Sequence, residues 1–363
     1  MLRPGLFSVL FLACSLALNA APTLVQGELH GAKFSVARPE KWNHQLLLLA
    51  HGLRAESSPI VADLFPDKFA YKTLLDEGWM IAKTSYRRNG PIVVDAIADL
   101  DALREHIAHT YGRPERVLLE GESMGGLIVA LMAEREPEHY AGAVALGAAL
   151  GFRENNMAIG LSLQPKIPLL FVSNRNELGG PENYVIAKVP RESAELRPAL
   201  FSIARDGHVN VNQRERLAAL RALVAWLDSG RDALPRPAEG ARFFDATVLA
   251  EPQPSLVTLH PDGRGFDAKV TEVSAIFGNL LLNAHPEDFA AAGIKPMAWF
   301  QLKVGDKVYR TRYGRDVKSV KRGEWVVYPN ADGFSWLSRN YENAAATLDI
   351  SNGATVTLRR YDQ

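Results

Sequence analysis

The 363-residue sequence has only one cysteine, Cys14, and no excess of either charge sign. A single cysteine excludes an internal disulfide framework. Lysine plus arginine equals aspartate plus glutamate at 41 each, so the net charge of zero gives no support to nucleic acid or to an anionic membrane surface as a partner. Because 47% of the residues are apolar, the composition also excludes a disordered or fibrous chain.

Long apolar runs are scarce as well. The run from residue 6 to residue 18 is too short to span a bilayer well, and it follows the positive charge of Arg3. This pattern predicts a signal peptide over residues 1–21 and a secreted or periplasmic protein, with no membrane contact after the signal is removed. A buried N-terminal helix and a lipoprotein signal around Cys14 are the two alternatives.

Short apolar runs alternate with helical periodicity over residues 22–232. The run at 45–50 is almost wholly apolar, whereas apolar side chains within 92–111 recur at the three- to four-residue spacing of one helix face. Fully apolar strands between helices predict an α/β domain with a doubly wound, mainly parallel sheet. The predicted strands are 45–50, 78–85, 116–120, 141–149, 167–173 and 199–204, and the predicted helices are 92–111, 125–136 and 213–229.

Residues 233–240 contain two prolines and no periodicity, which predicts a linker. After this linker, β-type runs separated by turn residues replace the helical pattern. The change predicts a second, smaller, mainly β domain over residues 241–363. Its predicted strands are 255–260, 268–277, 299–304, 307–311, 325–328 and 354–360.

The strongest chemical signal is the segment Gly121-Glu122-Ser123-Met124-Gly125. This Gly-x-Ser-x-Gly pattern stands between a predicted strand and a predicted helix, where a sharp turn exposes the serine. A serine hydroxyl is a weak nucleophile, so it needs a base to take its proton and donors to hold the oxyanion that forms. Ser123 is therefore the predicted nucleophile, and a purely structural serine is the alternative.

Two backbone N–H groups are predicted to form the oxyanion hole. The turn presents the Met124 N–H as one donor, and the second donor is expected in the loop after an earlier central strand. The strand at 45–50 leads into His51-Gly52-Leu53. We therefore predict the Leu53 N–H as the second donor, while His51 shapes the loop instead of moving protons. An ordinary His-Gly turn is the alternative.

Nine histidines compete for the role of base. His208 follows a predicted strand and lies 85 residues after Ser123. Serine, acid and histidine in this order along the chain form one known arrangement of a catalytic triad. His208 is the predicted base, and a surface loop histidine is the alternative.

The acid is expected in the loop after the strand at 167–173. Glu177 is the first carboxylate there and can orient and stabilise the imidazole of the base. Glu177 is the predicted acid, with an exposed loop charge as the alternative interpretation. The other candidates are Glu182 in the same loop, followed by Asp206 and Glu154.

These residues together resemble the α/β-hydrolase superfamily over about residues 27–230. The resemblance implies an esterase-like or peptidase-like serine hydrolase that uses no metal and no organic cofactor. The loop Tyr86-Arg87-Arg88-Asn89-Gly90 also looks like a loop of this superfamily, although Arg-Gly is usual there and Asn89 interrupts it. Members usually insert a lid before the strand at 167–173, and residues 151–166 are too few for a separate helical lid.

The segment Ile276-Phe277-Gly278-Asn279 resembles a motif that opens the C-terminal β-barrel domain of the S-adenosylmethionine hydroxide adenosyltransferase family. The likeness covers about residues 265–360 and implies a barrel-like domain, in which Phe277 and Asn279 match the positions nearest the adenine. Ala275 and Leu282 depart from the motif, and the catalytic domain of that family is absent. The alternatives are a packing domain with Phe277 in its core, or a domain that covers the lidless site.

The first hypothesis is a secreted carboxylic ester hydrolase that acts on a small-molecule ester through an acyl-enzyme. The nearest alternative is a serine peptidase or amidase with the same machinery. A non-catalytic protein whose barrel holds a purine nucleoside-like ligand is the alternative from another class. The sequence leaves acyl specificity, alcohol specificity and oligomeric state open.

Overall fold

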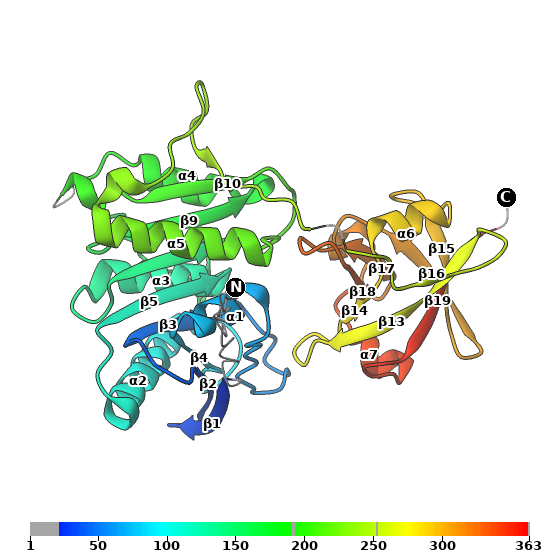
Figure 1. The fold of residues 1–363 in the computed structure, drawn as a ribbon, viewed down its shortest axis with the longest axis horizontal. Helices are drawn as coiled ribbons and strands as arrows, with labels where there is room; N and C mark the ends of the chain where they lie inside the picture. Colours follow the sequence, from blue (N-terminus) through cyan, green and yellow to red (C-terminus); the bar gives the residue numbers. More distant parts are fainter. Residues whose placement is uncertain (1–21, 191–192, 252, 362–363) are drawn as a thin grey trace, which may run out of the picture.

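The computed structural model describes residues 22–190, 193–251 and 253–361, and it contains two units, one built on a large sheet and one on a β-barrel (Figure 1). The predicted signal peptide at residues 1–21 lies outside the described residues. Among the helices of the described ranges, none combines the length and the apolar character needed to cross a bilayer.

The first unit is organised around a nine-stranded sheet in the order β1-β2-β4-β3-β5-β6-β9-β10-β11. The pairings from β4 to β11 are parallel, whereas β1 and β2 form an antiparallel edge. The strands are β1 (Thr23–Leu29), β2 (Ala32–Arg38), β3 (Gln45–Ala50), β4 (Met80–Thr84), β5 (Arg116–Glu122), β6 (Gly142–Leu146), β9 (Leu169–Asn174), β10 (Ala199–Ile203) and β11 (Phe244–Asp245). A separate hairpin consists of β7 (Arg153–Glu154) and β8 (Met157–Ala158).

Helices cover both faces of this sheet. Alternate leucines of β3 enter two separate apolar clusters, one shared with α2 and α3 and the other with α1 and α5. This alternation is what a strand buried on both faces requires, and the predicted doubly wound α/β fold is confirmed. The helices are α1 (Phe69–Asp76), α2 (Val93–Tyr111), α3 (Met124–Arg135), α4 (Gly179–Ile186) and α5 (Gln213–Ser229).

The second unit is a seven-stranded barrel in the order β13-β14-β18-β17-β16-β15-β19, closed by pairing between β13 and β19. Its interior is apolar, and Phe289 stacks on Tyr313 with ring centroids 4.4 Å apart. The predicted barrel-like domain is confirmed. Its elements are β12 (Thr258–Leu259), β13 (Gly265–Val273), β14 (Leu280–Leu282), α6 (Pro286–Ala291), β15 (Trp299–Val304), β16 (Lys307–Tyr313), β17 (Trp325–Pro329), β18 (Ser335–Arg339), α7 (Ala344–Leu348) and β19 (Thr355–Arg360).

The first sheet includes a strand that follows the predicted linker at 233–240. Phe244 and Asp245 form β11, which pairs in parallel with β10. The ring of Phe244 also packs against Phe201, with centroids 5.0 Å apart. The barrel elements begin only with β12, so the segment between the units includes an edge strand of the first.

A buried ionic network connects two helices to the central strand β5. Arg216 of α5 donates to Glu120 and Glu122 of β5, and to Tyr71 Oη of α1 at 3.0 Å. Tyr71 Oη donates to Glu120 at 2.8 Å. Burial raises the pKa of Glu120, which is 2% exposed, and the Arg216 guanidinium opposes the rise. The network fixes the strand that leads directly to Ser123.

Arg216→Met should lower the free energy of unfolding by about 3–5 kcal/mol, because it leaves the buried carboxylate of Glu120 without its counter-charge. Urea unfolding of the full chain measures this loss. The control is Arg221→Met, which breaks the exposed pair with Glu77 at 2.7 Å and should change stability by less than about 1 kcal/mol. Equal losses in the two variants would contradict a special role for the buried network.

Candidate active site

Ser123 occupies a strained turn between β5 and α3. Its φ of 56° and ψ of −114° are rarely adopted by a residue with a side chain. The Ser123 N–H donates to Leu146 O at 2.9 Å, and Ser123 O accepts from the N–H groups of Leu127 and Ala149 at 3.2 and 3.0 Å. These bonds come from α3 and from the end of β6 with the loop after it, so the surroundings maintain the strained conformation.

Glycines on both sides of Ser123 permit this turn. A Cβ on Gly121 would lie 2.1 Å from Gly125 O, and a Cβ on Gly125 would lie 2.0 Å from Ala50 O. Both contacts involve backbone atoms, which cannot rotate away as a side chain can. The start of α3 therefore packs directly against the end of β3 and the loop that follows it.

The structure brings together the three residues predicted as nucleophile, base and acid. His208 Nε2 lies 2.8 Å from Ser123 Oγ, and His208 Nδ1 is hydrogen-bonded to Glu177 Oε1. The second carboxylate oxygen of Glu177 accepts the Val209 N–H at 3.2 Å. The His208 side chain is 58% exposed, so the hydrogen-bonded chain is open to solvent.

The other three acid candidates have different partners. Glu182 pairs with Arg242, Asp206 lies 3.9 Å from Arg175 Nη1, and Glu154 accepts the Val94 N–H at 3.3 Å. Only Glu177 among the four contacts the imidazole of His208.

Two residues that the sequence did not single out, Gly147 and Asn174, help to position Glu177 and the loop of His208. Gly147 has a φ of 52°, and a Cβ there would lie 2.8 Å from Glu177 Oε2, so glycine makes room for the carboxylate. Asn174, buried at the end of β9, donates to Arg205 O at 3.1 Å and to Asn210 O at 3.0 Å, which fixes the loop of His208. The available signal for Asn174 was a polar residue at the carboxyl end of a buried strand.

The predicted oxyanion loop lies against the nucleophile. A Cβ on Gly52 would lie 3.1 Å from Ser123 Cβ, and the next residue, Leu53, is 44% exposed. Within the described ranges, neither the Leu53 N–H nor the Met124 N–H makes a hydrogen bond. Both donors are therefore available to an oxyanion formed beside Ser123.

His51 is part of the loop structure and is unsuited to be the base. Burial, and after it the charges of Arg54 and Lys83, lowers the pKa of His51 to about 3. The neutral ring has one N–H, which donates either to Gly52 O at 2.7 Å or to Ser85 O at 3.0 Å. Its ring nitrogens thus face backbone carbonyls, whereas those of His208 face Ser123 and Glu177.

The barrel faces the edge of the sheet at which the parallel strands end, as the arrowheads of β9 and β10 show (Figure 1). Ser58 belongs to the same loop as Leu53, and Gln213 follows His208 by five residues. The barrel therefore contacts the segments that follow Leu53 and His208, on either side of Ser123. The polar contacts are Ser58 Oγ to Ile276 O at 3.5 Å, Lys68 Nζ to Glu272 Oε2 at 2.8 Å, and Gln213 N–H to Asp332 Oδ1 at 3.0 Å.

The two barrel residues predicted near a ligand, Phe277 and Asn279, do not line the cavity beside their segment. Phe277 is 54% exposed, so it is not a core residue, and the Asn279 carbonyl accepts the Ser274 N–H at 2.8 Å. A cavity of about 390 Å³ lies beside this segment, and Phe277 and Asn279 are not among its lining residues. Binding of a nucleoside-like ligand stays a prediction. The lining includes Ser274, Gly278, Asn343, Ala345, Asp349 and Ser351.

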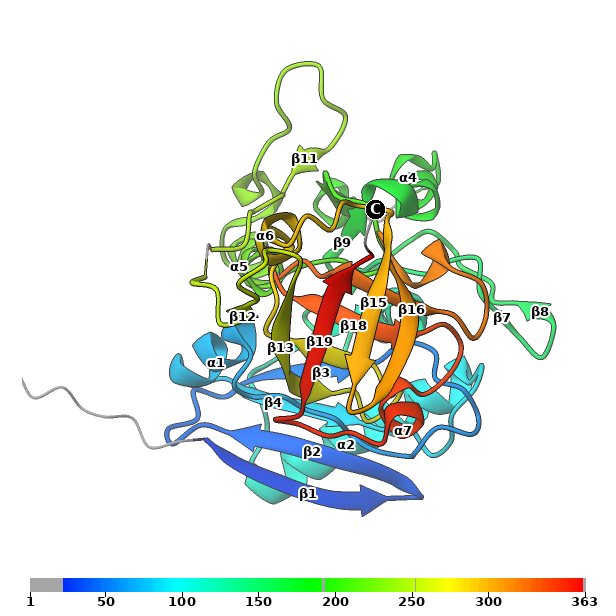
Figure 2. The same cartoon turned by 90° about the vertical axis from the view of Figure 1, so that its right-hand side faces the viewer.

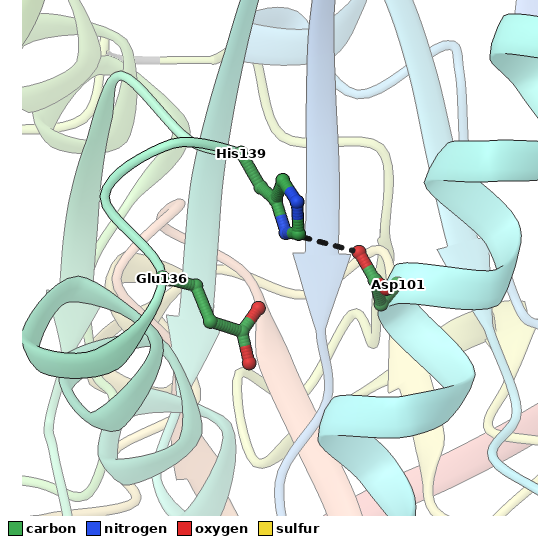
Figure 3. A group of neighbouring side chains, drawn as sticks. All are labelled: Asp101, Glu136 and His139. Atoms are coloured by element: carbon green, nitrogen blue, oxygen red, sulfur yellow. Dashed lines mark ion pairs between the residues drawn. The ribbon is translucent and has the colours of Figure 1, made fainter.

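A separate cluster of possible metal ligands consists of Asp101, Glu136 and His139 (Figure 3). Their ligand atoms lie within 4.8 Å of one another. Arg104 already donates to Asp101 Oδ1 at 2.6 Å, so a cation bound there would meet an adjacent guanidinium charge. Glu136 follows the last residue of α3, whereas Ser123 precedes the first, so the helix separates this cluster from the nucleophile.

Two segments of the chain match known protein families. Residues 85–196, which include Ser123 and Glu177, match the family described as serine aminopeptidase, S33. Residues 275–357 match the family described as SAM hydroxide adenosyltransferase C-terminal domain. Both resemblances are confirmed. Each match covers less than half of the chain, and His208 and Leu53 lie outside the first. A comparison with curated proteins gives no match.

Solved structures with similar folds include hydrolases and a protein without an assigned activity. An uncomplexed acylaminoacyl peptidase from Pyrococcus horikoshii is 13% identical with a TM-score of 0.42, over 61% of this chain and 43% of that chain. An esterase/lipase from an uncultured bacterium is 14% identical with a TM-score of 0.39, over 50% and 74%. An uncharacterized conserved protein from Thermotoga maritima is 21% identical with a TM-score of 0.27, over 48% and 55%. The chain thus spans about half the length of the first and third of these structures.

Gly125→Ala should lower the free energy of unfolding by about 3 kcal/mol, because its Cβ would overlap backbone atoms of Ala50 that have no room to move. Gly151→Ala is the matched control, since a Cβ at Gly151 meets nothing within 4 Å. Thermal and urea unfolding of both full-length variants make the comparison. A Gly125→Ala protein as stable as the control would contradict the tight packing between the turn and the loop after β3.

Proposed function

We propose that this protein is a serine hydrolase that cleaves a carboxylic ester through an acyl-enzyme. The observation that carries the proposal is the continuous hydrogen-bonded chain from Ser123 Oγ through His208 to Glu177. An α/β-hydrolase fold, a strained serine turn and two unoccupied N–H donors accompany it.

In the first half of the reaction, Ser123 Oγ attacks the carbonyl carbon of the ester while its proton passes to His208 Nε2. The Glu177 carboxylate accepts a hydrogen bond from the Nδ1–H group of His208 and stabilises the imidazolium that forms. The N–H groups of Leu53 and Met124 hold the oxyanion of the tetrahedral intermediate. The intermediate collapses when the alcohol leaves with the proton from Nε2, and the acyl group remains on Ser123.

In the second half, water takes the place of the alcohol. His208 Nε2 removes a proton from the attacking water, and the same two N–H groups hold the second oxyanion. Collapse of this intermediate returns the proton to Ser123 Oγ and releases the carboxylic acid. The exposed edge of His208 gives water access to the reacting atoms.

A serine peptidase or amidase would use the same residues, and the matched family carries an aminopeptidase description. The two activities differ in the leaving group, since an amine must be protonated before it departs. Parallel assays with p-nitrophenyl esters and with aminoacyl p-nitroanilides distinguish them. Turnover of anilides at rates comparable to esters would replace the ester proposal with the peptidase alternative.

Ser123→Ala should abolish covalent labelling by a fluorophosphonate probe, because the probe phosphonylates the activated serine oxygen. His208→Ala should reduce the labelling rate by about 10³-fold or more, since the base that removes the proton is lost. Gel fluorescence after a timed reaction measures both. Ser202→Ala is a control outside the site and should label like the original chain. Full labelling of Ser123→Ala would refute the assignment.

The barrel is proposed to take the place of the missing lid. Residues 151–166 form only the β7–β8 hairpin and connecting loops, while the barrel touches the loop of Leu53 and the start of α5. The exposed Phe277 directly follows the contact residue Ile276. Substrates therefore enter between the hydrolase loops and this rim of the barrel, and bulky acyl groups meet the rim first.

Lys68→Glu should change the preference between a short and a long acyl p-nitrophenyl ester by up to about fivefold, because it replaces attraction to Glu272 with repulsion. The ratio of kcat/KM for the acetate and the decanoate measures the change. The swap Lys68→Glu with Glu272→Lys is the matched control, and it should restore the original ratio. An unchanged ratio in the single variant would mean that the barrel does not govern access.

A further inference from the structure

A chain of zero net charge contains one strongly basic stretch. Residues 299–322 have four lysines and four arginines against two aspartates, a net charge of +6, so the rest of the chain carries −6. This stretch forms β15, β16 and the short 3-10 turn Val317–Ser319. We call the outer surface made by these elements the basic face.

The strand pattern places the cations on the outside of the barrel. Phe300 and Leu302 of β15 are buried in the barrel core, so the alternating residues between and after them point outward. In the register of the two strands, Trp299 lies opposite Arg312, Gln301 opposite Arg310, and Lys303 opposite Val308. The outward side of β15 and β16 therefore carries Lys303, Arg310 and Arg312 side by side.

The chain that follows β16 extends this face. A Cβ on Gly314 would lie 2.7 Å from Val326 Cγ2, so the segment packs against the outside of β17 and buries Val326. Lys318, Lys321 and Arg322 on this segment are exposed. The guanidinium of Arg322 lies over the ring of Tyr341, 5.7 Å from its centroid.

The cations of the basic face are not neutralised within the fold. Within the described ranges, none of the eight lysines and arginines of 299–322 forms an ion pair with a carboxylate. Arg310 and Arg312 instead lie over the ring of Trp299, 4.0 and 5.5 Å from its centroid. Stacking on an aromatic ring orders a guanidinium while its N–H groups stay free for an anion.

The basic face is also turned away from the hydrolase unit. Figure 2 views the molecule from the barrel side, and β15, β16 and β19 lie in front of the other elements. In Figure 1 the same strands lie on the far side of the barrel from the large sheet. A partner bound there would leave the hydrolase site open.

We propose that the basic face docks the protein on the surface of a bilayer that contains anionic lipids. Charge complementarity is the main reason, since juxtamembrane basic clusters bind anionic headgroups in this way. An exposed apolar side chain, Val308 at 55% exposure, lies among the cations, and the half-buried Trp299 lies under its two arginines. Such mixtures are typical of surfaces that rest at the boundary between headgroups and acyl chains.

The details favour a bilayer over nucleic acid. Single-stranded nucleic acid would need an aromatic face for base stacking, and Arg310 already covers the ring of Trp299. The face is the outside of a barrel wall, and the cavities beside Glu134 and beside Gly278 are lined by other residues. A convex sheet surface fits a layer of lipid headgroups better than it fits a single strand of nucleic acid, which has to be held in a groove.

Co-sedimentation of the full chain with lipid vesicles tests this proposal. The protein should bind vesicles of phosphatidylcholine with phosphatidylglycerol at low salt, and high salt should release it. The variant Lys303→Gln, Lys307→Gln, Lys321→Gln should bind about 100-fold more weakly, because each cation near such a surface strengthens binding about fivefold. These three side chains are exposed, so the variant should fold normally.

The matched control removes the same charge elsewhere, by Lys33→Gln, Lys41→Gln, Lys166→Gln, all exposed. It should bind anionic vesicles as tightly as the original chain. Equal weakening of binding in both variants would overturn the proposal. Binding to pure phosphatidylcholine as tight as to anionic vesicles would also overturn it, because it would indicate insertion of an apolar segment such as residues 6–18. Binding to a DNA oligonucleotide but not to vesicles would assign the face to nucleic acid instead. Ester hydrolysis should be unchanged in both variants, so this test is independent of the proposed reaction.

Discussion

The conformation of one residue constrains the hydrolase unit more than any other feature. Ser123 adopts a positive φ at the junction of β5 and α3, and such a turn persists only where the surroundings enforce it. Gly121 and Gly125 bring the backbone of α3 against the end of β3, and the ionic network of Arg216 fixes β5 from the other face. The position of the serine oxygen is thus set by strands, helices and charges together.

The same close packing connects Ser123 to the proposed oxyanion loop. Gly125 lies against the carbonyls of Ala50 and His51, and Gly52 lies against Ser123. A shift of the turn would therefore move the loop as well. In the proposed reaction, such coupling would keep the N–H donors of Leu53 and Met124 at a fixed distance from the reacting oxygen, and preorganised donors of this kind supply a large share of catalysis.

The barrel adds two surfaces of different character to this core. Its inner rim contacts loops beside Ser123, through polar contacts at Ser58, Lys68 and Gln213. Its outer wall, the basic face, points away from the site. The two roles proposed for the barrel, control of substrate entry and attachment to a bilayer, therefore fall on different sides that share no side chains.

Most of the hydrolase fold was predictable from local pattern. The apolar run at 45–50 coincides with β3, and the helix predicted at 213–229 coincides with α5. The short strands β14 and β18 escaped prediction, because three to five residues give too little periodicity to detect. The strand β11 was also missed, since only its pairing with β10 makes two residues a strand.

For the site, the sequence by itself determined which residue types stand after which strands. Ser123, Glu177 and His208 follow β5, β9 and β10 respectively, and parallel strands end at one edge of a sheet, so their meeting could be predicted. The sequence already favoured Glu177 over Glu182 as the first carboxylate of its loop, and the tertiary contacts show that Glu177 meets His208 whereas Glu182 pairs with Arg242.

The roles of Gly147 and Asn174 also needed the fold, since both act on residues about 30 or more positions away in the chain. Charge shows the same division. The composition determined a net charge of zero and the sequence itself gathers cations in residues 299–322, whereas the tertiary structure alone placed those cations on one outer wall of the barrel. Strand alternation and sheet closure decide which way a side chain points, and neither is visible in a sum over the sequence.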